Sequence, residues 1–571
     1  MKKIFCVLLS AVMVLSAVPL MASAEENTAA DLGIAVGADL HYNVPSEELE
    51  TVIEGDDIYW YANRRAALED ESGFIIDEFL AQCAADDSVE YVLIPGDLAD
   101  NGKSVQQEHI DVAAKLKKFE KESGKDVFVI PGNHDYGVDC ATNLDDFISI
   151  YADFGFDKAI ETFEGTASYT ADLGSKYRLI ALDSCDPTVS TADGMSLKEI
   201  MWVCDQADKA YEDGRYPILM MHHNLLDHLP VQRIVSKNFI VRFHYTTATL
   251  FADHGIKVVF SGHEHCNDTT SYTTPAGNTI YDFATTSLSM YPIQYTVMQL
   301  TDDTISYNAR TITSIDTDAL SSTVKGYTPE QLALMNEDFN AYAKGFLKAG
   351  VRYRLELSLS MEKMGIAEDA IYYNLVNTAV SGLTDILKMP LYGENSVQEL
   401  AKEYNIVIPE SEYATPWDLA TELVAAHYAG EEAYNVDSTE VAILLRTVAL
   451  ILHSDLATVN DEVFISFVNS LLDGMGITST ATQDIRKLAA KVFGGVKPAE
   501  YFITLLISPL LYEFAFDGDN VPDNNGEAAG YNSDVTNLDN IATNLSNIFN
   551  KILIYIENSF VVIGRMFGIN R

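Results

Sequence analysis

The sequence predicts an α/β domain over residues 30–315, followed by an all-helical domain over residues 325–516. In the first part, short apolar runs alternate with helix-forming stretches, which is the pattern of an α/β domain with largely parallel strands. From about Tyr327 onward the pattern changes to long helical periodicity. A chain of 571 residues also exceeds what one compact core accommodates, so two or more domains are expected.

Five apolar runs in the first part read as buried strands, and each ends in a loop. They are "GIAVGADLHY", "EYVLIPGDLAD", "DVFVIPGNHD", "YPILMMHHN" and "IKVVFSGHEH". Helices are expected between them over residues 66–84, 104–123 and 196–213. Three further runs, "NTIYDFATTSL", "PIQYTVMQLT" and "TISYNARTI", predict strands in hairpin order up to residue 312.

The helical domain has clear start signals. Thr328 and Pro329 are typical of an N-cap and a first helical residue, and Gln331 occupies the reciprocal capping position. A second Thr-Pro pair at Thr415 repeats this opening.

The two ends of the chain are predicted to lie outside these domains. Residues 1–24 have two lysines, an apolar stretch and Ala-Ser-Ala, which indicates a signal peptide and a secreted protein; an uncleaved anchor is the alternative. Residues 517–545 are expected to be a polar linker, and residues 546–571 a terminal amphipathic helix. Charges interrupt that helix too often for it to span a membrane. Docking on the protein is favoured over peripheral contact with the cell envelope.

Charge and cysteine content narrow the classes of function. The formal net charge is −47, and such a surface disfavours nucleic acid as a primary partner. Five of the six cysteines follow the signal peptide, and their spacing establishes no disulfide framework. Oligomeric state is not indicated.

Side chains that bind metals or transfer protons follow each of the five predicted strands. The carboxyl ends of the strands are where an open α/β sheet places a binding site. Proline and glycine end the strands and permit tight turns near a bound group. The residues are Asp39, His41, Asp97, Asp100, Asn133, His134, His222, His223, His263 and His265.

The motifs "DLH", "GDLAD", "GNHD", "HH" and "GHEH", in that order, resemble those of the calcineurin-like metallophosphoesterases over about residues 33–312. The resemblance implies a four-layer αββα sandwich with a two-metal centre of manganese, iron or zinc. One metal would be held by Asp39, His41, Asp97 and His265, and the other by Asp97, Asn133, His222 and His263. His223 competes with His222 for the second site.

The resemblance also implies hydrolysis of a phosphate monoester or diester by in-line attack of a metal-bound hydroxide. His134 matches the histidine that assists the leaving group, and Asp100 matches the carboxylate that orients it. Asn101 stands where phosphoprotein phosphatases have a phosphate-gripping arginine, which argues against that subgroup and slightly favours a diester. A non-catalytic scaffold and a secreted nucleotidase are the alternatives. His109 is expected on a helix surface, and His228 and His244 in loops that can border the site.

Overall fold

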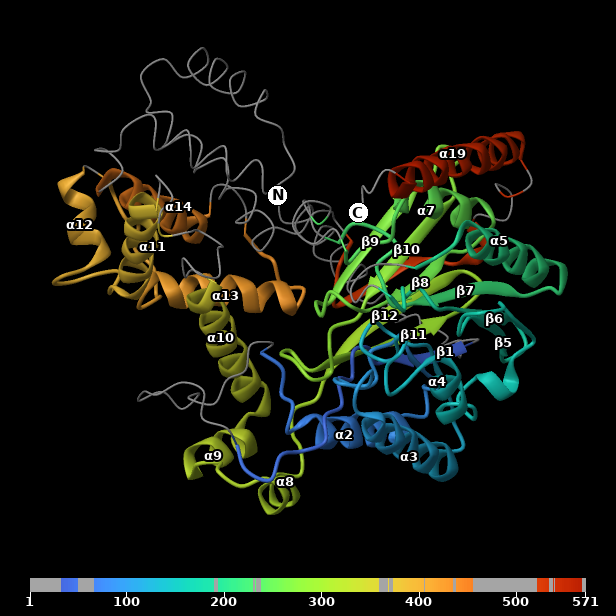
Figure 1. Cartoon of the computed structure of the whole chain (residues 1–571), viewed down its shortest axis with the longest axis horizontal. Coiled ribbons are helices and arrows are strands. Elements are labelled where there is room, and N and C mark those ends of the chain that lie inside the picture. The colour runs from blue at the N-terminus through green and yellow to red at the C-terminus, as the bar shows by residue number, and fades with distance from the viewer. Residues whose placement is uncertain are drawn as a thin grey trace, which may run out of the picture.

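The computed structural model describes residues 32–49, 66–188, 194–228, 232, 238–358, 368, 373–404, 406–434, 438–454, 521–533, 538 and 540–566. The predicted signal peptide lies outside these residues. The described chain has two parts, an α/β part and a smaller helical part that lies beside it (Figure 1).

The first β-sheet carries the first three predicted strands at its centre and edge. Its order is β13-β12-β11-β1-β2-β3, in which β1, β2 and β3 are parallel and β11, β12 and β13 are antiparallel to their neighbours. The parallel strands are apolar runs buried on both faces, as their sequences predict. The bounds are β1 Leu32–Val36, β2 Tyr91–Ile94, β3 Asp126–Val129, β11 Gln294–Leu300, β12 Thr304–Thr311 and β13 Asn525–Ala529.

The second sheet has the order β4-β5-β6-β7-β8-β10-β9. Strands β6, β7, β8 and β10 run parallel, and hairpin-like antiparallel pairs close both edges. The bounds are β4 Glu161–Thr162, β5 Tyr169–Leu173, β6 Tyr177–Leu182, β7 Tyr216–Met221, β8 Val258–Ser261, β9 Asp268–Thr273 and β10 Thr279–Ala284.

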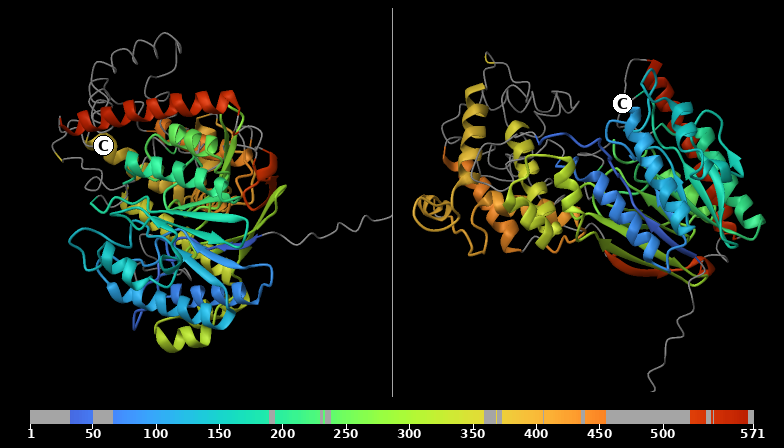
Figure 2. Two further views of the ribbon diagram at one scale, coloured as in Figure 1. Left: turned by 90° about the vertical axis from the view of Figure 1, so that its right-hand side faces the viewer. Right: turned by 90° about the horizontal axis from the view of Figure 1, so that it is seen from below.

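The two sheets pack face to face, and helices cover both outer faces (Figures 1 and 2). Helices α2 (Ser72–Ala85), α3 (Gln106–Ser123) and α4 (Leu144–Ile150) cover the first sheet, and α5 (Leu197–Glu212), α7 (His244–Asp253) and α19 (Ile541–Met566) cover the second. A core cluster that includes Ile34, Phe128, Met220 and Phe260 fills the space between the sheets. The four-layer αββα prediction is therefore confirmed.

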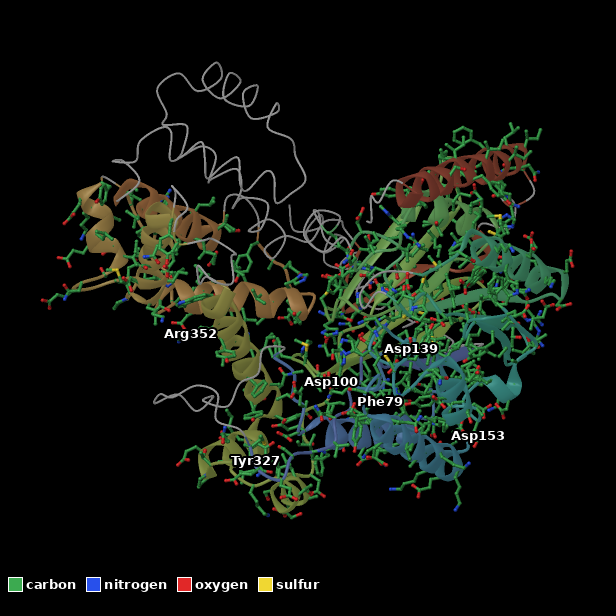
Figure 3. All side chains as sticks on the ribbon, viewed as in Figure 1. Phe79, Asp100, Asp139, Asp153, Tyr327 and Arg352 are labelled. Atoms are coloured by element: carbon green, nitrogen blue, oxygen red, sulfur yellow. The ribbon has the colours of Figure 1, made fainter. Side chains whose placement is uncertain are left out.

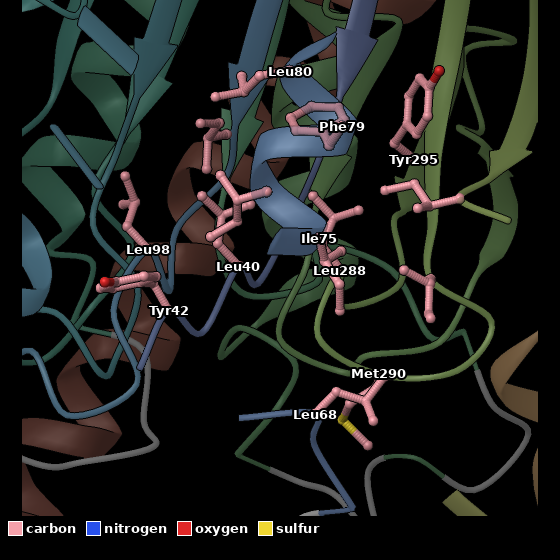
Figure 4. Close-up of a cluster of buried hydrophobic side chains, with 14 of the residues drawn as sticks. Leu40, Tyr42, Leu68, Ile75, Phe79, Leu80, Leu98, Leu288, Met290 and Tyr295 are labelled. Atoms are coloured by element: carbon pink, nitrogen blue, oxygen red, sulfur yellow. The ribbon is translucent and has the colours of Figure 1, made fainter. Parts of the chain in front are cut away.

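A second apolar cluster joins α2 to the first sheet and to the loops at its end (Figure 4). Phe79 and Ile75 of α2 pack there with Leu40, Leu288 and Met290, all nearly inaccessible to solvent. Leu40 lies between Asp39 and His41, so this packing fixes the position of the loop that carries these two predicted site residues.

The helical part follows the predicted start signals. Capping boxes at Thr328 and Thr415 open α9 and α13. Its described helices are α8 Thr317–Thr323, α9 Pro329–Glu337, α10 Phe339–Ser358, α11 Tyr373–Lys388, α12 Val397–Glu403, α13 Pro416–Tyr428 and α14 Thr439–Ser454. The predicted helical stretch beyond residue 454 lies outside the described residues. Helices α9 and α10 pack into the core of the α/β part through Met335, Phe339 and Tyr342, and α13 contributes Ala425 to the same core. Helices α11 to α14 also form a cluster of their own.

Part of the predicted polar linker is wrong, because residues 525–529 form the edge strand β13. The strand pairs antiparallel with β12, from Thr304↔Ala529 to Asn308↔Asn525. Its side chains bury little, and its stability comes from backbone hydrogen bonds and from Tyr531, which is buried and donates to the Pro217 carbonyl. Such a strand has no apolar run, so hydrophobic patterning does not reveal it.

The terminal helix α19 begins at Ile541, earlier than the predicted residue 546, and docks on α7 and α5. Within the described part of the chain, no helix is long and apolar enough to cross a membrane.

Candidate metal centre

Loops from both sheets build the candidate site. Strands β1, β2 and β3 of the first sheet and β7 and β8 of the second end at the same side of the sandwich. The polar residues that follow these strands therefore meet between the two sheets. In the view of Figure 3, Asp100 lies on the side of the α/β part that faces α10.

The first group of potential ligands contains Asp39, His41, Asp97 and His265, with one atom of each lying within 4.8 Å of all the others. The Nε2 atoms of His41 and His265 are 3.0 Å apart. Asp39 Oδ1 lies 3.9 Å from His41 Nε2 and 3.5 Å from His265 Nε2. These four atoms converge on one point, as the ligands of a single cation do.

The second group contains Asp97, His222 and His263, again within 4.8 Å of one another. Asp97 Oδ2 lies 3.5 Å from His222 Nε2, and Asn133 Oδ1 lies 3.1 Å from the same nitrogen. Asn133, predicted as a ligand of the second metal, thus borders this group through its amide oxygen.

The geometry favours His222 over His223 as the ligand. His222 Nδ1 donates to the Pro95 carbonyl over 2.9 Å, which leaves the Nε2 lone pair facing Asp97 and Asn133. The side chain of His223 turns instead to Ser184, whose hydroxyl lies 2.9 Å from Nδ1. The sequence left this choice open because both histidines directly follow the same strand.

Asp97 lies between the two groups. Its Oδ2 is 3.6 Å from His41 Nε2 and 3.5 Å from His222 Nε2, so one oxygen faces both groups. Its Oδ1 accepts a hydrogen bond from the His134 backbone N–H over 2.8 Å. Burial by itself would raise the pKa of Asp97, but the neighbouring histidines, His222 first, hold it well below its usual range. Asp97 is therefore an ionised carboxylate in the position of a bridge.

Five of the predicted ligands have a left-handed backbone. The φ angles are 48° for Asp39, 41° for His41, 49° for Asp97, 69° for His263 and 64° for His265. Non-glycine residues adopt this region rarely and at a cost, and they cluster at functional sites. The surrounding packing thus holds these loops in a conformation that aims side chains at one place.

Glycines before the polar residues permit close approach of the loops. A Cβ on Gly132 would lie 2.2 Å from Asp97 Oδ1, and a Cβ on Gly262 would lie 2.4 Å from Asp39 Oδ2. Each glycine of "GNHD" and "GHEH" therefore makes room for a carboxylate from another loop.

Asp100 lies beside both His41 and His134, and the predicted role of its carboxylate in orienting His134 stays a prediction. His134 Nδ1 donates to the main-chain carbonyl of Asp100 over 2.7 Å. The carboxylate lies 3.3 Å from Nδ1 of His41, through Oδ1. Asp100 thus orients His134 through its backbone and supports the candidate ligand His41 through its side chain.

The residues fit a pair of cations. Asp39 Oδ1 and His263 Nε2 are buried and have no hydrogen-bond partner among the described residues. A buried polar atom without a partner is costly, and coordination of a cation would satisfy both atoms. The mixture of imidazole nitrogen, carboxylate and amide oxygen suits zinc, iron or manganese.

One residue beside the site, Asp135, was not predicted. The Asp135 carboxylate is buried and accepts from the N–H groups of Gly132, Leu98 and Ala99, which ties the loop after β3 to the loop after β2. Asp135 is the last residue of the "GNHD" motif, and this position in the motif was the sign in the sequence that it belongs near the site.

His109 was expected on a helix surface, and that expectation is wrong. The ring is buried, Nε2 donates to the Asp135 carbonyl over 2.8 Å, and Nδ1 accepts from the Tyr151 hydroxyl over 3.0 Å. Burial lowers the pKa of His109 to about 4, so the ring stays neutral.

The other histidines near the site also have structural partners. His228 is buried between Asp268 and Asp282, whose carboxylates raise its pKa well above the usual value despite burial. His244 lies 3.5 Å from Asp227 Oδ2, through Nε2. Neither belongs to a group of potential metal ligands among the residues that the structure describes.

The helical part supports the loop that carries His265. The Tyr428 carbonyl at the end of α13 accepts from the Asn267 N–H over 3.1 Å. Met290 Sδ lies 3.1 Å from His265 Nδ1, and Asn340 of α10 donates to the Pro292 carbonyl in the same loop as Met290. The C-terminal helices are thus joined to the site rather than separated from it.

Comparison with known families agrees with this site. Residues 33–267 match the family described as calcineurin-like phosphoesterase. This segment of the chain is therefore a calcineurin-like phosphoesterase domain.

Two solved structures are similar to this chain over 49% of its length. A dimetal phosphatase from Danio rerio has 13% identity and a TM-score of 0.36, covering 49% of this chain and 96% of its own. A conserved uncharacterized protein from Streptococcus pneumoniae TIGR4, a predicted phosphoesterase, has 12% identity and a TM-score of 0.21, covering 49% of this chain and 89% of its own. No curated protein matches the chain.

Proposed function

We propose that the chain is a secreted two-metal phosphoesterase that hydrolyses a phosphate diester or monoester. The observation that carries the proposal is the position of Asp97, whose Oδ2 lies 3.6 Å from His41 Nε2 and 3.5 Å from His222 Nε2. One carboxylate oxygen shared by two groups of nitrogen and oxygen ligands is the arrangement that holds two cations close together.

In this proposal Asp39, His41, Asp97 and His265 hold one cation, and Asp97, Asn133, His222 and His263 hold the other. Bound cations of this kind lower the pKa of water and neutralise charge on a phosphoryl group. The chain's own contribution is to fix the ligands, because Pro95 orients His222 and Asp100 lies against His41.

His134 is the proposed proton donor to the leaving oxygen. The hydrogen bond to the Asp100 carbonyl holds a proton on His134 Nδ1, so Nε2 is the nitrogen that exchanges a proton with the substrate. Its ring centroid lies 4.9 Å from that of His41, which puts it beside the first ligand group. Its half-buried position leaves room for contact with a substrate at the rim.

A diester is the favoured substrate class. Asn101, at the position of the phosphate-gripping arginine of phosphoprotein phosphatases, donates to Glu108 through both its backbone N–H and its side-chain amide. A formal net charge of −47 further disfavours a dianionic monoester relative to a monoanionic diester.

Secretion is proposed from the leader-like residues 1–24, and the mass of the exported protein tests it.

The test is hydrolysis of bis-p-nitrophenyl phosphate and p-nitrophenyl phosphate by purified protein supplied with manganese or zinc. We expect turnover of both esters and a higher kcat/KM for the diester. Asp97→Asn is the matched control, since it keeps the side chain's size, removes the bridging charge and should abolish activity. If neither ester is hydrolysed with any metal while metals bind, the chain is a non-catalytic scaffold and the proposal fails.

A further inference from the structure

Helix α19 has its polar side toward the protein and its apolar side toward solvent. A surface helix of a globular protein normally has the opposite arrangement, with an apolar stripe that faces the core. The polar and the apolar side chains of α19 lie on opposite faces of the helix, and each set extends over several turns.

The inner face is mainly polar. Thr543 accepts from Asn278 over 3.1 Å, Asn547 donates to the Asp253 carbonyl over 3.3 Å, and Glu557 accepts from Thr246 over 3.3 Å. Ile554, which is 1% exposed, adds an apolar anchor in the core between α5 and α7. These residues are spaced by four, seven and three positions, so they lie on one face of the helix. Polar contacts to the second-sheet layer therefore hold much of this helix.

The outer face is apolar over sixteen residues. Its large side chains are 48–78% exposed and also recur every three or four positions: Ile541, Leu545, Ile548, Phe549, Ile552, Tyr555 and Ile556. In Figures 1 and 2 the helix lies on the outside of α7, at the surface of the α/β part. A contiguous exposed apolar patch of this kind marks an interaction surface.

A second copy of the chain is a poor fit to this surface. Each copy has a formal net charge of −47, which opposes the association of two copies.

A lipid surface fits better. Binding of an interfacial helix depends on buried apolar area and needs no shape complementarity. The helix itself has two basic residues, Lys551 and Arg565, and one acidic residue, Glu557, so it does not share the acidity of the whole chain. Phe549 and Tyr555 add aromatic rings, which favour the lipid–water boundary.

We propose that α19 lies flat on a lipid bilayer, with Ile541 to Ile556 facing the acyl chains and the α/β part above the surface. Apolar contact supplies the affinity, so binding does not require anionic lipid. Because the whole chain is acidic, added salt screens its repulsion and strengthens binding to anionic vesicles.

The test is flotation of the full chain with vesicles of phosphatidylcholine alone, and of phosphatidylcholine mixed with phosphatidylglycerol. The wild type should float with both. The triple variant Ile548→Gln, Phe549→Gln, Ile552→Gln should lower the partition coefficient by roughly 100-fold or more. Its unfolding midpoint and its hydrolysis of bis-p-nitrophenyl phosphate should not change, since these side chains face solvent.

A matched control carries the same number of substitutions on other exposed apolar residues: Ile110→Gln, Ile160→Gln, Val407→Gln, whose side chains are 45%, 49% and 73% exposed. This variant should bind vesicles like the wild type. The proposal is overturned if the wild type does not float with either vesicle, if both variants bind equally well, or if binding needs anionic lipid and weakens with salt. A lipid-independent dimer that the helix variant abolishes would assign the surface to a second copy instead.

Discussion

Replacement of Asp100 by asparagine separates the two contacts that this residue makes. Asp100→Asn removes the charge that lies 3.3 Å from His41 Nδ1, but it keeps the main-chain carbonyl 2.7 Å from His134 Nδ1. The substitution therefore weakens the support of a candidate metal ligand and leaves the proposed proton donor in place. We expect a defect in metal binding with near-normal turnover at saturating metal.

The size of the defect follows from the type of contact. Loss of a carboxylate that orients a ligating histidine typically costs about 10–100-fold in metal affinity, or about 1.4–2.7 kcal/mol. Asp100 is only 6% exposed, so little solvent screening reduces this value. Turnover of the loaded protein should stay within the same order of magnitude as the wild type.

The assay has two readouts and one reference variant. Calorimetric titration of the metal-free protein with manganese or zinc gives affinity, and bis-p-nitrophenyl phosphate hydrolysis at saturating metal gives turnover. His134→Ala should show the opposite pattern, with normal affinity and a loss of about 10²–10⁴-fold in turnover. If Asp100→Asn binds metal normally and loses turnover as His134→Ala does, the carboxylate orients His134 and the present reasoning is wrong.

Three further predictions concern stability and metal content. The Cβ of Gly132→Ala would lie 2.2 Å from Asp97 Oδ1, so this variant should lose about 1–3 kcal/mol of folding stability and contain less bound metal on elemental analysis. Gly382→Ala, whose Cβ would meet no atom within 4 Å, should change neither quantity. Burial raises the pKa of Glu71 to about 7 in the folded protein. In the unfolded chain the same carboxyl ionises at a lower pH, so the contribution of Glu71 to the free energy of unfolding falls as the pH rises from about 4 to about 7. Glu71→Gln should remove this loss, so at pH 8 its free energy of unfolding in urea should exceed that of the wild type by on the order of 3 kcal/mol. If the two proteins show the same dependence of stability on pH, the prediction is contradicted. A chelator should lower the melting temperature of the wild type, reversibly on addition of manganese or zinc, and leave Asp97→Asn unchanged.

Local patterns in the sequence predicted the frame of the site well. The apolar runs before Asp97, Asn133 and His263 are buried parallel strands, and the polar residues after them meet at one side of the sandwich. Both properties are local: a buried strand needs a continuous apolar run, and a loop at its carboxyl end needs residues that stop it. The metal-binding roles of these residues stay predictions until metal is measured.

Features without a local pattern were missed. The polar edge strand β13 depends on pairing with β12, which is more than two hundred residues away along the chain. His109 lies on an otherwise ordinary amphipathic helix, and its burial follows from the contact of that helix with the Asp135 loop. In α19, periodicity predicted an amphipathic helix but not that its polar side would face the protein.

The sequence by itself determined the kinds of side chain at the site and their positions at the ends of strands, because both are set by residues within a few positions of each other. Only the tertiary structure decided which atom does what: His222 rather than His223 faces Asp97, and the Asp100 carbonyl accepts from His134 Nδ1. These choices depend on how the loops of two sheets pack against each other, and packing joins residues that no local pattern relates.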